Sequence, residues 1–85
     1  MVRVLLRAPL SEIAGGREFE LAGGTVLDVL VELERTRPAV IGWVLDERRS
    51  IRQHVNVYIN GHLAREDAAV GANDRIHVLP AITGG

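Results

Sequence analysis

Residues 55–63 read VNVYINGHL, and this short stretch does most to decide the fold. Its apolar residues Val55, Val57 and Ile59 alternate with other side chains, which is the period of two expected of a strand with one buried face. Asn60-Gly61 then gives the strongest short hairpin signal, because both residues tolerate the positive φ angles of a tight turn. The sequence therefore predicts a strand, a tight turn and a short returning strand.

A further strand is predicted to follow Asn73-Asp74, a turn signal in which Asn73 can adopt a positive φ at low cost. Successive side chains of a strand point to opposite faces, so this strand has two inward and two outward residues. The inward pair is Ile76 and Val78, and the outward pair is His77 and Leu79. Pro80 cannot donate to a strand ladder, so the strand should end there.

Two more strands are predicted upstream of residue 22. Residues 2–7 alternate, with Val2, Val4 and Leu6 on one face, and Pro9 ends that segment. Residues 18–21, EFEL, alternate again after Gly15-Gly16, with Phe19 and Leu21 facing inward. We expect the two segments to pair as an antiparallel hairpin joined by a longer loop.

A helix is predicted between the two upstream strands and the three later ones. Thr25 is suited to cap it, because a threonine hydroxyl accepts from the first free amides, and Pro38 prevents its continuation beyond about Arg37. Its apolar stripe comprises Val26, Leu30 and Leu33, widened by Leu27 and Val31. Residues 39–45, which include the only tryptophan, Trp43, should form one helical turn or a packed loop. Residues 46–53 are expected to be an exposed loop.

This order of elements favours an α+β protein in which a mixed, four- to five-stranded sheet packs on one main helix. Eighty-five residues suffice for one domain. We expect residues 1–80 to form that domain and residues 81–85 to be a flexible tail.

Composition excludes several classes of function. The net charge is −1 and no basic stripe is visible, so nucleic-acid binding is not expected. No segment is long and apolar enough for a signal or a membrane span, which favours a cytoplasmic location without membrane contact. There is no cysteine, so any sulfur that the protein handles must be held elsewhere. All ten basic residues are arginine, which reflects either GC-rich codon usage or the benefit of lacking amines that capture acyl groups.

The chain ends in Gly84-Gly85, shortly after the last predicted strand. Glycine has no Cβ, so such a tip can enter a narrow tunnel and present its carboxylate to another enzyme. A carboxylate becomes an acyl donor when it is adenylated, and a sulfide or persulfide can then displace AMP to leave a thiocarboxylate. Gly85 is thus the candidate for adenylation and sulfur attachment, with Ile82, Thr83 and Gly84 giving access.

Residues 55–85 resemble the C-terminal part of the MoaD/ThiS family of sulfur carriers. The resemblance lies in VNVYIN at 55–60, the turn that ends in Asp74, and LPAITGG at 79–85, although Asn73 stands where members often have glycine. It implies a ubiquitin-like β-grasp fold and a thiocarboxylate on Gly85, made by an E1-like adenylating enzyme that uses ATP. It also implies a sulfur-accepting synthase as second partner, no bound cofactor, and a carrier that is not itself an enzyme.

The two segments that point to a subfamily are VNVYIN at 55–60 and LPAI at 79–82. They resemble the sequence of the carrier of a cysteine-biosynthesis route, the CysO type, more than that of the small subunit of molybdopterin synthase. The thiamine-pathway carrier is usually shorter through the region of residues 38–53. Carriers for other sulfur-containing metabolites remain open. So do two further classes: a ubiquitin-like interaction module, and a protein modifier that forms isopeptides through Gly85.

Four residues fall on the outer faces of their strands and are expected to form an exposed apolar patch, hereafter the outer-face patch: Leu5, Tyr58, His77 and Leu79. We interpret it as a docking surface for the adenylating enzyme and the sulfur acceptor. The alternative is that the loop after Pro38 covers part of it. The three histidines have no metal-ligand spacing, so we expect no metal site, and we expect a monomer when the protein is free.

Overall fold

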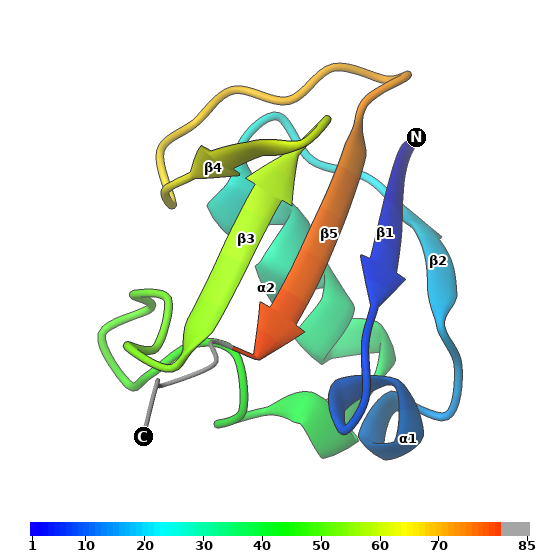
Figure 1. Ribbon diagram of the computed structural model, residues 1–85, viewed down its shortest axis with the longest axis vertical. Coiled ribbons are helices and arrows are strands. Elements are labelled where there is room, and N and C mark those ends of the chain that lie inside the picture. The colour runs from blue at the N-terminus through cyan, green and yellow to red at the C-terminus, as the bar shows by residue number, and fades with distance from the viewer. Residues whose placement is uncertain (81–85) are drawn as a thin grey trace.

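Five strands form one mixed sheet in the computed structural model of the protein, which describes residues 1–80 (Figure 1). The sheet order is β2-β1-β5-β3-β4, with β1 and β5 parallel and every other neighbouring pair antiparallel. The fold is the α+β, ubiquitin-like β-grasp that the sequence predicts. The strands are β1 (Val2–Leu6), β2 (Glu18–Leu21), β3 (Val55–Ile59), β4 (His62–Ala64) and β5 (Arg75–Pro80).

The main helix α2 (Val26–Thr36) packs against one face of the sheet, behind β3, β5 and β1 in Figure 1. The Thr25 hydroxyl accepts a hydrogen bond from the Asp28 amide at 3.1 Å, which confirms the predicted N-cap. Four of its residues are buried: Val26, Val29, Leu30 and Leu33. Val29 was missing from the predicted stripe, although it lies three residues after Val26 and therefore on the same face.

The strand alternation sets which side chains enter the core. Ile76 and Val78 are 0% exposed, and Val57 on the neighbouring strand is 1% exposed. His77 and Leu79 are half-buried and point to the other face, so the predicted register of the last strand is confirmed. Leu21 is buried as predicted, whereas Phe19 packs only partly against the core.

A short helix, α1 (Leu10–Ala14), stands where the sequence predicted a loop between β1 and β2. Gly15 ends it in the left-handed conformation, with φ 78°, which a glycine adopts without steric cost. The helix buries Leu10 and Ala14. Residues 38–40 form the 3₁₀ turn η1 (Pro38–Val40), and residues 41–45 follow as a loop that buries Val44 and Leu45, so both expected alternatives occur in part.

The two predicted turns differ in how they are built. Asn60 (φ 49°) and Gly61 (φ 86°) make the tight β3–β4 turn as predicted. The turn at Asn73 before β5 forms as predicted, but Asn73 does not adopt a positive φ in it. Instead, the Asp74 carboxylate accepts from the Gly71 amide at 2.8 Å and thereby closes the turn without strain.

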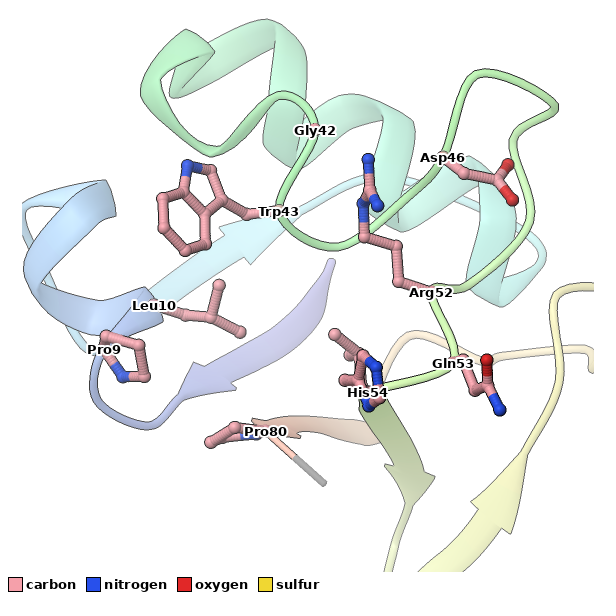
Figure 2. A pocket seen from close by; sticks show the side chains of 10 residues that line it. Pro9, Leu10, Gly42, Trp43, Asp46, Arg52, Gln53, His54 and Pro80 are labelled. Carbon is pink, nitrogen blue, oxygen red and sulfur yellow. The ribbon is translucent and has the colours of Figure 1, made fainter. Parts of the chain in front are cut away.

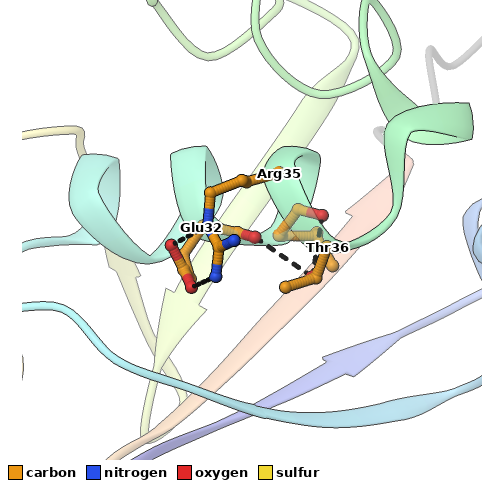
Figure 3. Close-up of polar contacts among 4 residues, drawn as sticks. Glu32, Arg35 and Thr36 are labelled. Atoms are coloured by element: carbon orange, nitrogen blue, oxygen red, sulfur yellow. Dashed lines mark hydrogen bonds and ion pairs between the residues drawn. The ribbon is translucent and has the colours of Figure 1, made fainter.

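The outward side of α2 is polar (Figure 3). Arg35 donates to the Glu32 carboxylate through Nε at 2.9 Å and through a second guanidinium nitrogen. These hydrogen bonds lower the pKa of Glu32 below its ordinary value. The Thr36 hydroxyl donates to the Glu32 carbonyl at 3.1 Å, one turn before the helix ends. Both charged residues lie outside the buried stripe of the helix.

Candidate functional site

The sheet face opposite α2 carries the outer-face patch. His77 lies at the centre, with Leu5 as its direct partner on β1 and Tyr58 as its direct partner on β3. Cross-strand partners project from the same face, so the three side chains form one row across the sheet. Leu79 follows His77 by two residues on β5, opposite Asn56, and shares this face. The structure therefore brings the four predicted residues together, and each is half-buried.

Leu63 extends the row and was missed by the sequence analysis. It is the direct partner of Tyr58 in the β3–β4 hairpin and is 67% exposed. Its strand has only three residues, too few for an alternation to be recognised. The Asn60-Gly61 turn could have predicted the position of Leu63. A two-residue turn fixes which residues of the hairpin are partners, and it places Leu63 opposite Tyr58.

The loop after Pro38 does not lie over this patch. η1 packs against α1 and α2, and Val40, Val44 and Leu45 are buried in the core. Trp43, by contrast, is 51% exposed, and its ring lies near Leu10 in a pocket that Pro80, at the end of β5, also lines (Figure 2). The alternative in which this loop covers the patch therefore has no support in the described residues.

The carrier residues proposed from the sequence, Ile82, Thr83, Gly84 and Gly85, lie outside the described residues. What the structure does place is the residue that leads into them. Pro80 is the last residue of β5 and pairs with Val55 at the start of β3.

A pocket of about 680 Å³ opens beside Pro80, and we refer to it as the tail-root pocket. In Figure 2, Pro9, Leu10 and Trp43 lie on one side of it, and Arg52 and His54 lie on the other. Its walls come from the start of α1, the loop after η1, the segment that leads into β3, and the end of β5. The sequence analysis missed it because no local pattern reveals residues that gather from separate segments.

The loop at 46–53 is more ordered than its sequence suggested. The Asp46 carboxylate accepts from the amides of Arg48 at 2.8 Å and Ser50 at 3.0 Å, and these bonds lower the pKa of Asp46. Further on, the Ile51 amide donates to the Glu66 carboxylate at 2.7 Å, which lowers the pKa of Glu66. The loop is thus fixed on both sides, and it holds Arg52 at the pocket wall.

The described residues contain no cluster of three or more His, Asp or Glu side chains arranged to bind a metal ion. Nor does any described helix combine the length and apolarity needed to cross a membrane. The features that stand out are the outer-face patch and a last strand that is followed by a glycine pair.

A β-grasp sheet with a partly exposed outer-face patch and a final strand followed by Gly84-Gly85 defines the class of ubiquitin-like carriers and modifiers. The chain belongs to the ThiS family, whose sequence model matches residues 4–85. Within this class the protein acts as a carrier or modifier and is not an enzyme.

Small archaeal modifier protein 1 of Haloferax volcanii is 32% identical over 83 residues, covering 94% of this chain and 95% of that protein. The solution structure of the same modifier from Methanosarcina acetivorans superposes with a TM-score of 0.87 at 32% identity, over 99% of this chain and 95% of that one. The BexX/CysO complex of Amycolatopsis orientalis contains a chain with a TM-score of 0.88 at 27% identity, covering 100% of both chains. Identity is therefore higher to the two archaeal modifiers than to this complex, and the expected closeness to the CysO type is not supported.

Proposed function

We propose that the protein carries an activated acyl group on Gly85 and that the product is a thiocarboxylate used as a sulfur donor. An E1-like enzyme joins the Gly85 carboxylate to AMP and releases pyrophosphate from ATP. Hydrosulfide then attacks the acyl carbon, AMP leaves with the bonding electron pair, and the thiocarboxylate remains. Because activation consumes ATP, we place the reaction in the cytoplasm. The observation that carries the proposal is the family match, which extends through Gly85.

We assign the outer-face patch to docking of the activating enzyme and of the sulfur-accepting synthase. Leu79 is the patch residue nearest in sequence to the tail, so a partner that holds Gly85 must pass close to it. Tyr58 supplies the aromatic side chain that interface centres favour. Leu63 lengthens the row toward β4 and adds apolar area at its edge.

A second candidate function is protein modification through an isopeptide bond from Gly85. The 32% identity to a relative named as a small modifier supports it. Activation is common to both candidates, and only the final nucleophile differs: hydrosulfide in one case and a lysine amine of another protein in the other. Delivery of sulfur to cysteine or to molybdopterin biosynthesis remains a narrower proposal within the first candidate.

Intact-mass analysis after co-expression with the cognate activating enzyme tests both candidates. A thiocarboxylate appears as replacement of one oxygen by sulfur, whereas modification appears as adducts with other proteins. The matched control carries one alanine after Gly85, which buries the reactive carboxylate inside a peptide bond. If the extended protein still forms the thiocarboxylate without prior cleavage, Gly85 is not the carrier residue.

A further inference from the structure

The proposed function does not account for the tail-root pocket, whose lining combines apolar side chains with charged ones. Trp43, Pro9 and Leu10 make one wall apolar. Arg52 and His54 lie on the opposite side, and Pro80 lies at the bottom of the view in Figure 2. A ligand that fits this lining has an apolar side chain close to an anionic group.

Arg52 is available for such an anion. Within residues 1–80 the only ion pair joins Glu32 to Arg35, so Arg52 is not ion-paired in that part of the chain. The Asp46 carboxylate also lines the pocket. Two backbone amides donate to it and, with a smaller effect, the charge of Arg52 further lowers its pKa, but the two side chains form no ion pair. A guanidinium at the wall of a half-apolar pocket is suited to a carboxylate, which it can bind through two parallel hydrogen bonds.

The chain itself contains a segment with this chemistry. Residues 81–85, AITGG, carry one large apolar side chain, Ile82, and the carboxylate of Gly85. Five residues reach at most about 17 Å from Pro80, and a sphere of 680 Å³ is only about 11 Å across. The segment is therefore long enough for its carboxylate to reach any wall of the pocket.

We propose that the tail-root pocket binds residues 81–85 of its own chain, with Ile82 against Trp43 and the Gly85 carboxylate against Arg52. The proposal rests on the proposed function only in that Gly85 must end in a free carboxylate. The occupied pocket withholds Gly85 from solvent in the free carrier. An activating enzyme must then draw the tail out of the pocket before adenylation.

Trp43 is the only tryptophan, so its fluorescence reports on the pocket directly. Acrylamide quenching is measured on the full-length protein and on two full-length variants, Ile82→Ser and Arg52→Gln. We expect both variants to raise the quenching constant, and Arg52→Gln to reduce pocket occupancy by up to about fivefold, the factor of an exposed ion pair. Arg48→Gln is the matched control, because Arg48 does not line the pocket, and it should leave quenching unchanged.

Circular dichroism confirms that each variant is folded, and the ¹H–¹⁵N signal of the Trp43 indole gives a second readout. Equal quenching and equal indole shifts in the parent and in both variants would overturn the proposal. Quenching that depends on protein concentration would also overturn it, since the ligand would then be the tail of a second copy. The experiment needs no activating enzyme, so its outcome is independent of whether Gly85 is adenylated.

Discussion

Tyr58 and His77 are direct partners in the antiparallel pair of β3 and β5, on the sheet face opposite α2. Leu5 flanks His77 on the other side, so the row places this histidine between a leucine and a tyrosine. The core residues Ile76 and Val78 occupy the alternate positions of β5. One strand thus supplies both the core and the proposed docking surface, and single substitutions can separate the two roles.

Leu79→Asp is expected to impair activation without unfolding the protein. Leu79 belongs to the outer-face patch and is only half-buried, so an aspartate there can remain solvated. An interface anchor is worth about 2 kcal/mol, so adenylation by the cognate enzyme should fall roughly thirtyfold. The measurement is an adenylation assay beside a thermal melt.

Val78→Asp is the matched core variant on the same strand. Val78 is 0% exposed, so an aspartate would place an unpaired charge in the core, and we expect the domain to unfold. If the melts showed instead that Leu79→Asp unfolds and Val78→Asp does not, the inward and outward faces assigned to β5 would be reversed.

Gly23→Ala is expected to destabilise the fold by about 1–3 kcal/mol, the usual cost of overpacking. A Cβ at Gly23 would lie 2.8 Å from the backbone nitrogen of Val29, which cannot move unless α2 moves. At the adjacent Gly24, a Cβ would meet only Asp28 Oδ2, at 3.9 Å. Urea unfolding of Gly23→Ala and Gly24→Ala compares them, and equal stabilities would contradict the prediction.

Protonation of the Asp74 carboxylate is expected to lower the stability of the protein in acid. This carboxylate accepts from the Gly71 amide at 2.8 Å and from the Asn60 side chain at 3.0 Å, and these bonds lower the pKa of Asp74. Because the pKa of Asp74 is lower in the folded protein than its ordinary value of 3.8, the ionised carboxylate stabilises the folded state at pH values above 3.8. This stabilisation is lost as the pH falls through the folded-state pKa.

The comparison for this prediction is Asp74→Asn against the parent protein, melted at several pH values between about 7 and 3, a range that spans the ordinary pKa of Asp. The variant should melt below the parent at neutral pH, and the gap should narrow in acid. The exposed Asp67 provides a control, Asp67→Asn. If the difference in melting temperature between Asp74→Asn and the parent protein stays constant with pH, the ionised carboxylate is not the stabilising form.

Glu66→Ala should loosen the loop that carries Arg52. The Glu66 carboxylate accepts from the Ile51 amide at 2.7 Å, and the alanine variant leaves this amide without its acceptor. We expect a loss of about 1 kcal/mol and faster hydrogen exchange at Ile51. Glu66→Gln keeps an acceptor oxygen and should restore most of the protection. Unchanged exchange in the alanine variant would mean that this bond does not order the loop.

The sequence was sufficient where the structural signal is local. Val55, Val57, Ile76 and Val78 lie in strands whose period of two is visible over a few residues, and Asn60-Gly61 fixes the turn between β3 and β4. Since strand period determines the outward face, the outer-face patch could also be assembled residue by residue before its partners across the sheet were known.

Prediction failed where structure depends on contacts between distant segments. α1 has five residues, too few for a helical period to be read, and it is stabilised by burial of Leu10 and Ala14. The turn before β5 depends on the Asp74 carboxylate and not on the backbone freedom of Asn73. The tail-root pocket joins Pro9, Trp43 and Arg52, which only the tertiary fold brings together.

The parallel pairing of β1 with β5 has a practical consequence for handling the protein. Arg3 is the partner of Arg75 and Leu6 that of Val78, so Val2 lies beside the start of β5 while Pro80 lies at its far end (Figure 1). Met1 is 71% exposed. An affinity tag, a fluorophore or a biosensor surface coupled through Met1 would therefore be attached at the end of the sheet opposite Pro80, so that activating enzymes can be assayed on the immobilised carrier.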